Sequence, residues 1–372
     1  MTARPGTTDD KLVDLFCGLL ERYFDRVPDA ARIFQLIQDR GDIISNDHVA
    51  FRSFDMRSLL KVFLPFGYEV QYQNQTEKIP FNFVQKKLTA VWLKHPNADM
   101  PRVFISQLRL DELPKVATLM QPYIDGLNDP IDTIEPMDVP RLIEYLHTGL
   151  WPTPTYKDYS EIGQHSEYLA WVLYNEYYLN HFTLTVNRLQ SFDFQTQIQT
   201  VINQYSDEIR DIPEGADKMV SALCNKALQA VYLDIMDTFN TFLDVEDFVL
   251  NAPNDNALNI SPDGLLLQSS TKANIVKAKF PDGTHKIPGS YVEFAYRGIK
   301  PELLSDLLRG RRDLDTIEVD DLRDGFEVGN ANNIFESTYT RAAKTDVVDN
   351  ITSSFETSRS KLLSFLETYP TH

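Results

Sequence analysis

The chain has 372 residues, 42% of them hydrophobic, and 54 acidic against 36 basic side chains give a formal net charge of −18. This size and composition exclude a disordered chain, and the negative charge argues against nucleic acid or an anionic membrane surface as a partner. No run approaches the ~20 apolar residues that span a bilayer, and the opening "MTARPGTTDDK" lacks the apolar core of a signal peptide. We therefore expect a cytoplasmic protein. Its two cysteines, Cys17 and Cys224, lie in segments of helical periodicity and are expected to be core thiols.

The first part of the chain predicts two helices and then a unit of one strand, one helix and three strands. Helical periodicity over residues 9–24 and 28–41 indicates the two helices. A strand is predicted at residues 46–54 and a helix at residues 56–67. The three strands that complete the unit are predicted at residues 68–73, 87–94 and 102–110.

The second part repeats this order after a mostly helical connection at residues 109–170. A strand is predicted at residues 180–189 and a helix at 192–206, followed by a long helical stretch at about 214–250. The alternating pattern of strands then returns at residues 264–270, 273–280 and 290–298. The chain ends in a predicted amphipathic helix at residues 347–369.

These elements predict one α+β domain over residues 1–372, because no low-complexity linker divides the chain. Its expected parts, in chain order, are N-terminal helices at about 1–42, a first module at 43–109, a helical connection at 110–170, a second module at 171–298 with a helical insertion at 205–260, and a C-terminal extension at 299–372.

Three of the predicted strands each carry one side chain that can bind a metal. Because alternate residues of a strand share a face, His48 and Arg52 point the same way, and the same rule places His181 and Glu293 each on one face of its own strand. Two histidines and one carboxylate form the triad that holds non-haem Fe(II) and leaves coordination positions open. The other interpretation of Glu293, flanked by apolar residues, is an ion pair with Arg297 or Arg52.

Five stretches, taken in order, give the chain a specific resemblance. "HVAFR", "NHFT", "LLQSSTKA", "PGSYVEFAYRG" and "GFEVGNANNIFESTY" resemble the signature stretches of the 2-oxoadipate dioxygenase/decarboxylase family, also called hydroxyglutarate synthases. The resemblance covers roughly residues 10–345. That family resembles the vicinal oxygen chelate superfamily, which implies paired βαβββ modules forming a cupped mixed sheet around one central metal.

The resemblance also implies an activity and its site. The family's iron ligands fall on His48, His181 and Glu293, and its substrate-binding arginine falls on Arg52. The implied cofactor is Fe(II), and the implied reaction converts 2-oxoadipate and O2 to D-2-hydroxyglutarate and CO2, in lysine catabolism. The expected partners are therefore a small 2-oxo dicarboxylate and O2, while the sequence leaves the oligomeric state open.

A further substrate contact of the family falls on Val328 and Gly329 in "GFEVGNANNIFES". Longer bacterial members of the family have Val-Ser at this point, whereas this chain has Val-Gly, so the side-chain hydroxyl contact is absent here and backbone N–H donation remains available. We expect these two residues to lie in a short loop that closes over the pocket and donates N–H groups to a substrate carboxylate. The helical insertion is also longer than in those members and is expected to reshape the pocket rim.

Two other functions stay open at the level of sequence. A glyoxalase-type isomerase or lyase of the same superfamily needs no O2 and typically uses a fourth protein ligand, for which Gln268 or an acidic residue is the candidate. A non-catalytic binding protein would carry the triad as a remnant. The presence of all three ligands together with Arg52 argues against the second possibility.

Overall fold

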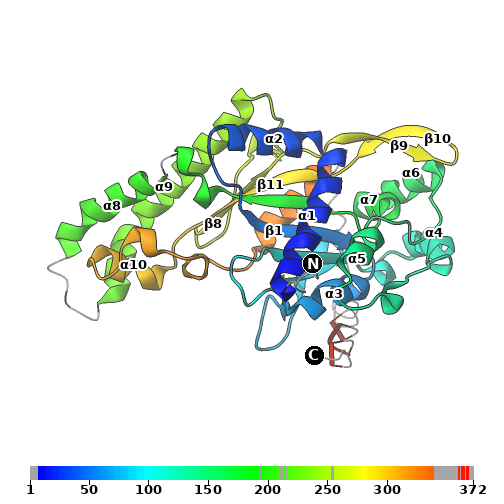
Figure 1. The fold of residues 1–372 in the computed structure, drawn as a ribbon, viewed down its shortest axis with the longest axis horizontal. Helices are drawn as coiled ribbons and strands as arrows, with labels where there is room; N and C mark the ends of the chain where they lie inside the picture. Colours follow the sequence, from blue (N-terminus) through cyan, green and yellow to red (C-terminus); the bar gives the residue numbers. More distant parts are fainter. Residues whose placement is uncertain are drawn as a thin grey trace, which may run out of the picture.

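The computed structural model describes residues 7–338 except 193, 210–212, 214–215 and 253–254, together with residues 359–360, 362–364 and 366–367. Two helices come first, α1 (Thr8–Arg26) and α2 (Pro28–Asp39), and lie in front of the central sheet in Figure 1. Thr7 and Asp10 form a capping box that starts α1, and α2 begins with a proline, whose fixed φ suits the first helical position.

The core of the molecule is a nine-stranded sheet built from two similar units. The first unit contains, in chain order, β1 (Asn46–Ser53), α3 (Arg57–Phe63), β2 (Glu69–Gln71), β3 (Phe81–Phe83), β4 (Leu88–Lys94) and β5 (Arg102–Leu108). The second contains β6 (His181–Thr185), α8 (Phe194–Ile209), α9 (Asp217–Val245), β7 (Asn259–Ile260), β8 (Leu266–Ser270) and β11 (Tyr291–Arg297). The strands follow the order β2-β4-β5-β1-β6-β11-β8-β7, and β3 pairs with β4.

The two units have the same topology and meet at the centre of the sheet. β1 pairs with β5 in parallel, β6 pairs with β11 in parallel, and β1 and β6 are antiparallel to each other. From β5 and from β11 the sheet continues outward through antiparallel neighbours. A pseudo-twofold axis between β1 and β6 therefore relates the units, which confirms the predicted α+β fold of paired βαβββ modules.

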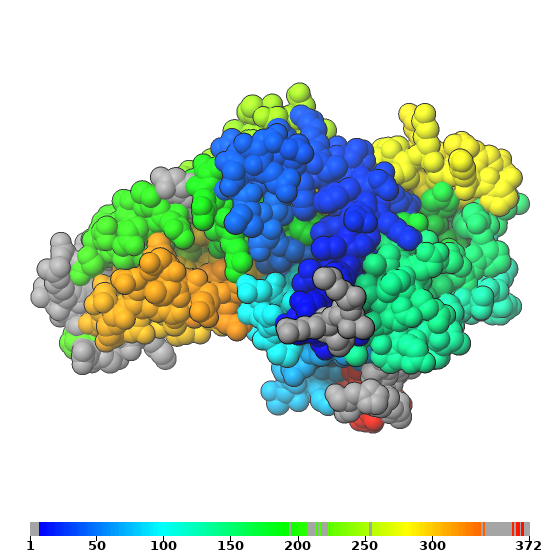
Figure 2. Space-filling model, in the orientation of Figure 1, coloured from blue at the N-terminus to red at the C-terminus, as the bar shows by residue number. Residues whose placement is uncertain are grey.

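Helices surround this sheet. The connection between the units holds α4 (Pro114–Asp125), α5 (Val139–Tyr145), α6 (Tyr156–His165) and α7 (Glu167–Asn175). The inserted helices α8 and α9 pack with α10 (Pro301–Leu308) into a lobe at one end of the molecule, and Figure 2 shows this lobe in green and orange. Among the described residues, no helix combines the length and the apolar character that crossing a membrane requires.

The structure differs from the sequence prediction in the outer strands of the second unit and in the segment around Val328. The strand predicted at 273–280 is β9 (Ile275–Phe280), which pairs with β10 (Gly283–Pro288) in a separate hairpin, yellow in Figure 2, while two-residue β7 takes the outer place in the second unit. The prediction of a loop around Val328 and Gly329 was wrong, because these two residues begin helix α11 (Val328–Ile334). Most of the helix predicted at 347–369 lies outside the described residues.

Candidate metal centre

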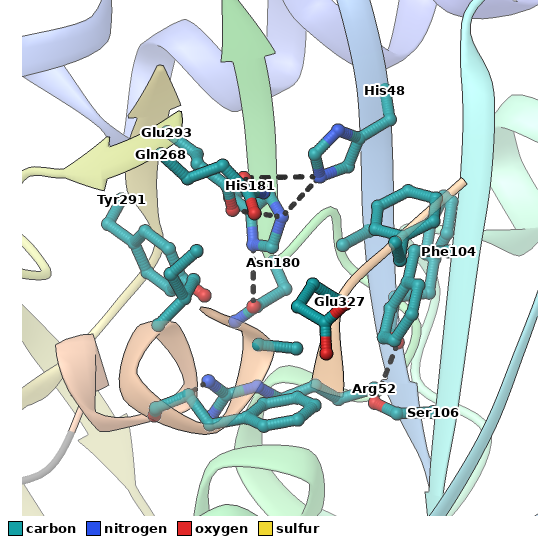
Figure 3. A pocket seen from close by; sticks show the side chains of 16 residues that line it. His48, Arg52, Phe104, Ser106, Asn180, His181, Gln268, Tyr291, Glu293 and Glu327 are labelled. Atoms are coloured by element: carbon teal, nitrogen blue, oxygen red, sulfur yellow. Dashed lines mark hydrogen bonds and ion pairs between the residues drawn. The ribbon is translucent and has the colours of Figure 1, made fainter. Parts of the chain in front are cut away.

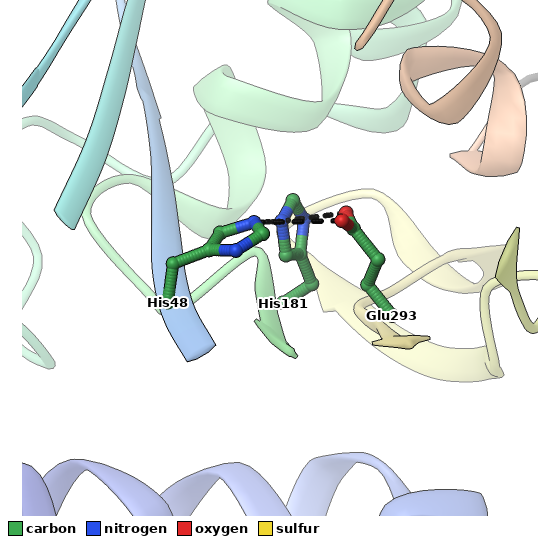
Figure 4. A group of neighbouring side chains, drawn as sticks. All are labelled: His48, His181 and Glu293. Atoms are coloured by element: carbon green, nitrogen blue, oxygen red, sulfur yellow. Dashed lines mark hydrogen bonds and ion pairs between the residues drawn. The ribbon is translucent and has the colours of Figure 1, made fainter. Parts of the chain in front are cut away.

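The three metal-capable side chains come from adjacent strands at the centre of the sheet and point toward one another (Figure 4). In the strand register, His48 of β1 and Glu293 of β11 both lie beside Thr183 of β6, one strand to either side, and His181 is two residues earlier on β6. The Nε2 atoms of His48 and His181 are 3.3 Å apart. The Glu293 carboxylate lies 3.1 Å from the Nε2 atom of His181 and 3.5 Å from that of His48.

Each histidine presents an unprotonated Nε2 to this centre. The Nδ1–H group of His48 donates to the Asp47 carboxylate at 2.8 Å, and that of His181 donates to Asn180 Oδ1 at 3.2 Å. The Asp47 carboxylate can only accept and so fixes the tautomer of His48, while the bond to Asn180 Oδ1 favours the same tautomer of His181; in this form both Nε2 lone pairs are directed inward. The Thr183 hydroxyl lies 3.0 Å from His48 Nε2 and can donate to it.

Burial sets the electrostatics of the three groups, which are 1%, 6% and 1% exposed for His48, His181 and Glu293. Desolvation lowers the pKa of both imidazoles and raises the pKa of Glu293 to about 8. An imidazole binds a metal in its neutral form. The buried Glu293 carboxylate faces the Nε2 lone pairs of both histidines, and a cation between the three groups would stabilise its ionised form. The ligand atoms lie within 4.8 Å of one another, so the residues fit a divalent metal ion.

Arg297 does not form the ion pair with Glu293 that the sequence left open. Its guanidinium binds the Asp47 carboxylate with two hydrogen bonds of 2.6 and 2.8 Å, and its Nη1 donates to the carbonyl groups of Arg323 and Gly325. Although burial alone would raise the pKa of Asp47, Arg297 holds it well below the usual range. Asp47 is therefore ionised and accepts the hydrogen bond from the Nδ1–H group of His48.

A pocket extends from the metal-capable residues to Arg52, which lies on β1 together with His48 (Figure 3). Arg52 is 1% exposed, and its Nη1 donates to Thr338 Oγ1 at 2.7 Å while its Nη2 donates to the carbonyl of Phe335 at 3.2 Å. Its Nε has no hydrogen-bond partner among the described residues. The guanidinium also lies over the rings of Tyr168 and Trp171. The pocket thus has a cationic donor at one end and acceptors for a cation at the other.

Comparison with known proteins identifies the family. The family described as 2-oxoadipate dioxygenase/decarboxylase matches residues 15–313. The chain belongs to this family. A 2-oxoadipate dioxygenase/decarboxylase of Oryza sativa subsp. japonica, named as chloroplastic/amyloplastic, is 34% identical over an alignment of 358 residues that covers 90% of this chain and 81% of the rice protein.

Solved structures agree with the family and the fold. The hydroxyglutarate synthase of Oryza sativa in complex with 2-oxoadipate matches with a TM-score of 0.69 and 31% identity, covering 91% of this chain and 95% of the rice chain. A putative glyoxalase superfamily protein from Ralstonia eutropha JMP134 matches with a TM-score of 0.54 and 15% identity, covering 80% and 86% of the two chains. The second likeness concerns the fold alone and fits the vicinal oxygen chelate architecture.

In this family member, the segment before α11 and α11 itself form one wall of the pocket. Phe326 and Glu327 line the pocket just before the helix, and Ala331 and Ile334 line it from within the helix. Val328 and Gly329 lie between these residues, and Gly329 is exposed. Their assignment as substrate contacts remains a prediction.

Residues missed at the level of sequence complete the site. Asp47 was missed because neighbours in a regular strand point to opposite faces, whereas the pairing of β1 with β6 is irregular between Asn46 and His48. Gln268, considered only as a ligand, instead donates its amide to Glu293 Oε1 at 2.5 Å. Asn330 donates to Gln268 Oε1 at 2.9 Å, and only the folded chain brings these two together.

Replacing Asp47 by asparagine is expected to weaken metal binding by about 10- to 100-fold, the range typical for partners of ligating histidines. An amide accepts the His48 proton less strongly than a carboxylate does, and it also loses the charge that holds Arg297. Co²⁺ titration of the folded variant measures the effect, and calorimetry separates it from the loss of stability expected on breaking a buried ion pair. An affinity equal to that of the wild type would show that His48 needs no anionic partner.

Proposed function

We propose that the chain is an Fe(II)-dependent dioxygenase/decarboxylase that converts 2-oxoadipate and O2 to D-2-hydroxyglutarate and CO2. Its family membership and its 31% identity to the rice hydroxyglutarate synthase in complex with 2-oxoadipate support the substrate. The observation that carries the proposal is the buried group of two histidines and one carboxylate, which is the ligand set of non-haem iron oxygenases. The lysine-catabolic context and the cytoplasmic location remain predictions.

The pseudo-twofold axis supports three protein ligands over the four of a glyoxalase-type centre. In the β1–β6 register, His48 lies opposite Thr183, and Ala50 lies opposite His181. A twofold rotation between the two strands therefore exchanges His48 with His181 and Ala50 with Thr183. Glu293 lies beside Thr183, so its counterpart in the first unit is the residue beside Ala50 on β5, namely Phe104. Phe104 lines the pocket and offers no ligand atom.

The orientation of Gln268 supports the same choice. A metal-binding amide uses its oxygen, yet the Gln268 oxygen accepts from Asn330 and its nitrogen faces Glu293. With three protein ligands, one face of the metal stays open for a 2-oxo acid and O2. Bound Fe(II) would supply chelation of the 2-oxo acid and activation of O2.

The protein groups around this centre have separate roles in the proposed reaction. Asp47 and Asn180 hold the Nδ1 protons of the two histidines, so that both Nε2 atoms stay available as ligands. Arg52 would bind the carboxylate at the far end of the substrate, replacing its contacts with Thr338 and Phe335. The rings of Phe104, Phe326 and Phe335 exclude water from the space between the two ends.

The protein loaded anaerobically with Fe(II) is expected to consume one O2 and release one CO2 for each 2-oxoadipate, since 2-oxoadipate plus O2 has the same atoms as 2-hydroxyglutarate plus CO2. An oxygen electrode and mass spectrometry of the product after reaction in ¹⁸O2 measure this stoichiometry. Adipate, which lacks the keto group needed for chelation, serves as the control and should give no uptake. Conversion of 2-oxoadipate without O2 consumption would instead support the isomerase or lyase, and tight binding without conversion the binding protein.

A further inference from the structure

The two oxygens of the Glu293 carboxylate have different surroundings. Oε1 accepts the 2.5 Å hydrogen bond from Gln268 Nε2 and lies 3.5 Å from His48 Nε2. Oε2 lies 3.1 Å from His181 Nε2. Because Oε1 already accepts from Gln268, Oε2 has fewer competing partners and is the better placed oxygen for a metal between the imidazoles. The hydrogen bond from Gln268 thus favours a geometry in which Glu293 acts as a ligand through one oxygen.

The amide of Gln268 is itself oriented by Asn330. The Asn330 Nδ2 group lies 3.3 Å from the backbone carbonyl of Leu266 and 3.5 Å from that of Asn259, and a carbonyl can only accept. The atom at this position must therefore be the NH2 group. The Gln268 atom that faces it at 2.9 Å must be the oxygen, which turns the Gln268 NH2 group toward Glu293. Gln268 and Asn330 are 3% and 2% exposed, so water does not offer a ready substitute.

Asn330 belongs to α11, which also docks on the second unit through Asn333. The Asn333 side chain donates to Asn259 Oδ1 at 2.7 Å, and the Asn333 carbonyl accepts from Asn251 at 3.3 Å. The same helix supplies Ala331 and Ile334 to the pocket wall. One short helix therefore forms part of the pocket wall and, through Asn330 and Gln268, is connected to the candidate ligand Glu293.

We propose that Gln268 and Asn330 are positioning residues that hold Glu293 as a one-oxygen ligand and couple the docking of α11 to metal binding. Without the Asn330 side chain, the buried Gln268 oxygen loses its donor, so the bond that fixes the orientation of the amide is gone and its NH2 group holds Glu293 less firmly. Coupling is reciprocal, so metal bound at Glu293 stabilises the docked helix by the same factor. This inference rests on the metal site of the proposed function.

The chain of hydrogen bonds from Asn330 through Gln268 to Glu293, here called the relay, can be distinguished from simple packing of α11 by three variants. Gln268→Leu removes the donor to Glu293, and Asn330→Ala removes the group that orients Gln268. Asn333→Ala is the matched control, because it removes a docking contact of the same helix and leaves the relay intact. We expect Co²⁺ affinity to fall about 10- to 100-fold in the first two variants and to stay within about threefold of wild type in the control.

The visible absorption of bound Co²⁺ gives a second readout, since a change in carboxylate denticity changes the coordination number and the band intensity. Unchanged affinity and absorption in folded Gln268→Leu or Asn330→Ala would overturn the proposal. An equal loss in Asn333→Ala would overturn it as well, because general docking would then explain the effect.

Hydrogen exchange of the wild-type protein tests the coupling even where a variant fails to fold. Adding Co²⁺ should slow the exchange of the α11 amides, and unchanged exchange at saturating Co²⁺ would overturn the coupling. These measurements use no substrate. Tight, relay-dependent Co²⁺ binding in a protein that consumes no O2 would therefore contradict the proposed function and leave this inference standing.

Discussion

His181→Ala is expected to reduce metal occupancy and turnover of 2-oxoadipate by more than about 100-fold, since even partners of metal ligands typically contribute 10- to 100-fold. His181 is the middle one of the three candidate ligands, with its Nε2 facing both His48 and Glu293. An alanine removes that nitrogen and leaves the Glu293 carboxylate with one imidazole instead of two. Elemental analysis after loading with Fe(II), followed by O2 uptake, measures the two effects.

His95 provides a matched control for this experiment. It is also a buried histidine, but its ring bonds the carbonyl of Phe66 at 3.0 Å and the amide of Asn97 at 3.1 Å, away from the candidate centre. The His95→Ala variant should bind metal at the candidate centre as the wild type does, even if its free energy of unfolding is lower. Full metal content in folded His181→Ala would remove His181 from the ligand set.

The candidate ligands could be proposed from sequence because they lie in strands whose alternating faces depend on local geometry and in stretches that resemble those of the family. Alternation within one strand is enough to place His48 and Arg52 on one face, and the repeated order of elements suggests that the two units pair. Register is a different matter, because it decides which residues of separate strands lie beside each other. That His48 and Glu293 both lie beside Thr183, and Phe104 beside Ala50, became visible only in the sheet.

Two contacts of the site that sequence reasoning could not supply join distant segments of the chain. Asn330 and Gln268 are 62 residues apart, and Arg297 and Asp47 are 250 apart. The segment around α11 was misread for a related reason. Its asparagine-rich sequence has low helix propensity, yet burial of Asn330 and Ile334 stabilises the helix in its place.

The contacts of Arg52 decide how it can serve a substrate. Two of its nitrogens are held by Thr338 and by the carbonyl of Phe335, both neutral acceptors. A carboxylate is the stronger acceptor, because its bond with a guanidinium is assisted by both charges and can use two parallel N–H groups. Exchange of these neutral partners for a substrate carboxylate therefore favours binding at the end of the pocket opposite the metal.

Arg52→Lys is expected to lower kcat/KM for 2-oxoadipate by about 5- to 150-fold, which corresponds to about 1–3 kcal/mol of transition-state stabilisation. Lysine keeps the charge, but its single ammonium lacks the planar fork and the stacking over Tyr168 and Trp171. Metal content should stay at the wild-type level, because the guanidinium is no ligand. Arg57→Lys, which changes an exposed arginine paired with Asp55, is the matched control and should leave both quantities unchanged. Wild-type kinetics in Arg52→Lys would mean that another group holds the substrate carboxylate, whereas loss of metal would mean that Arg52 supports the centre itself.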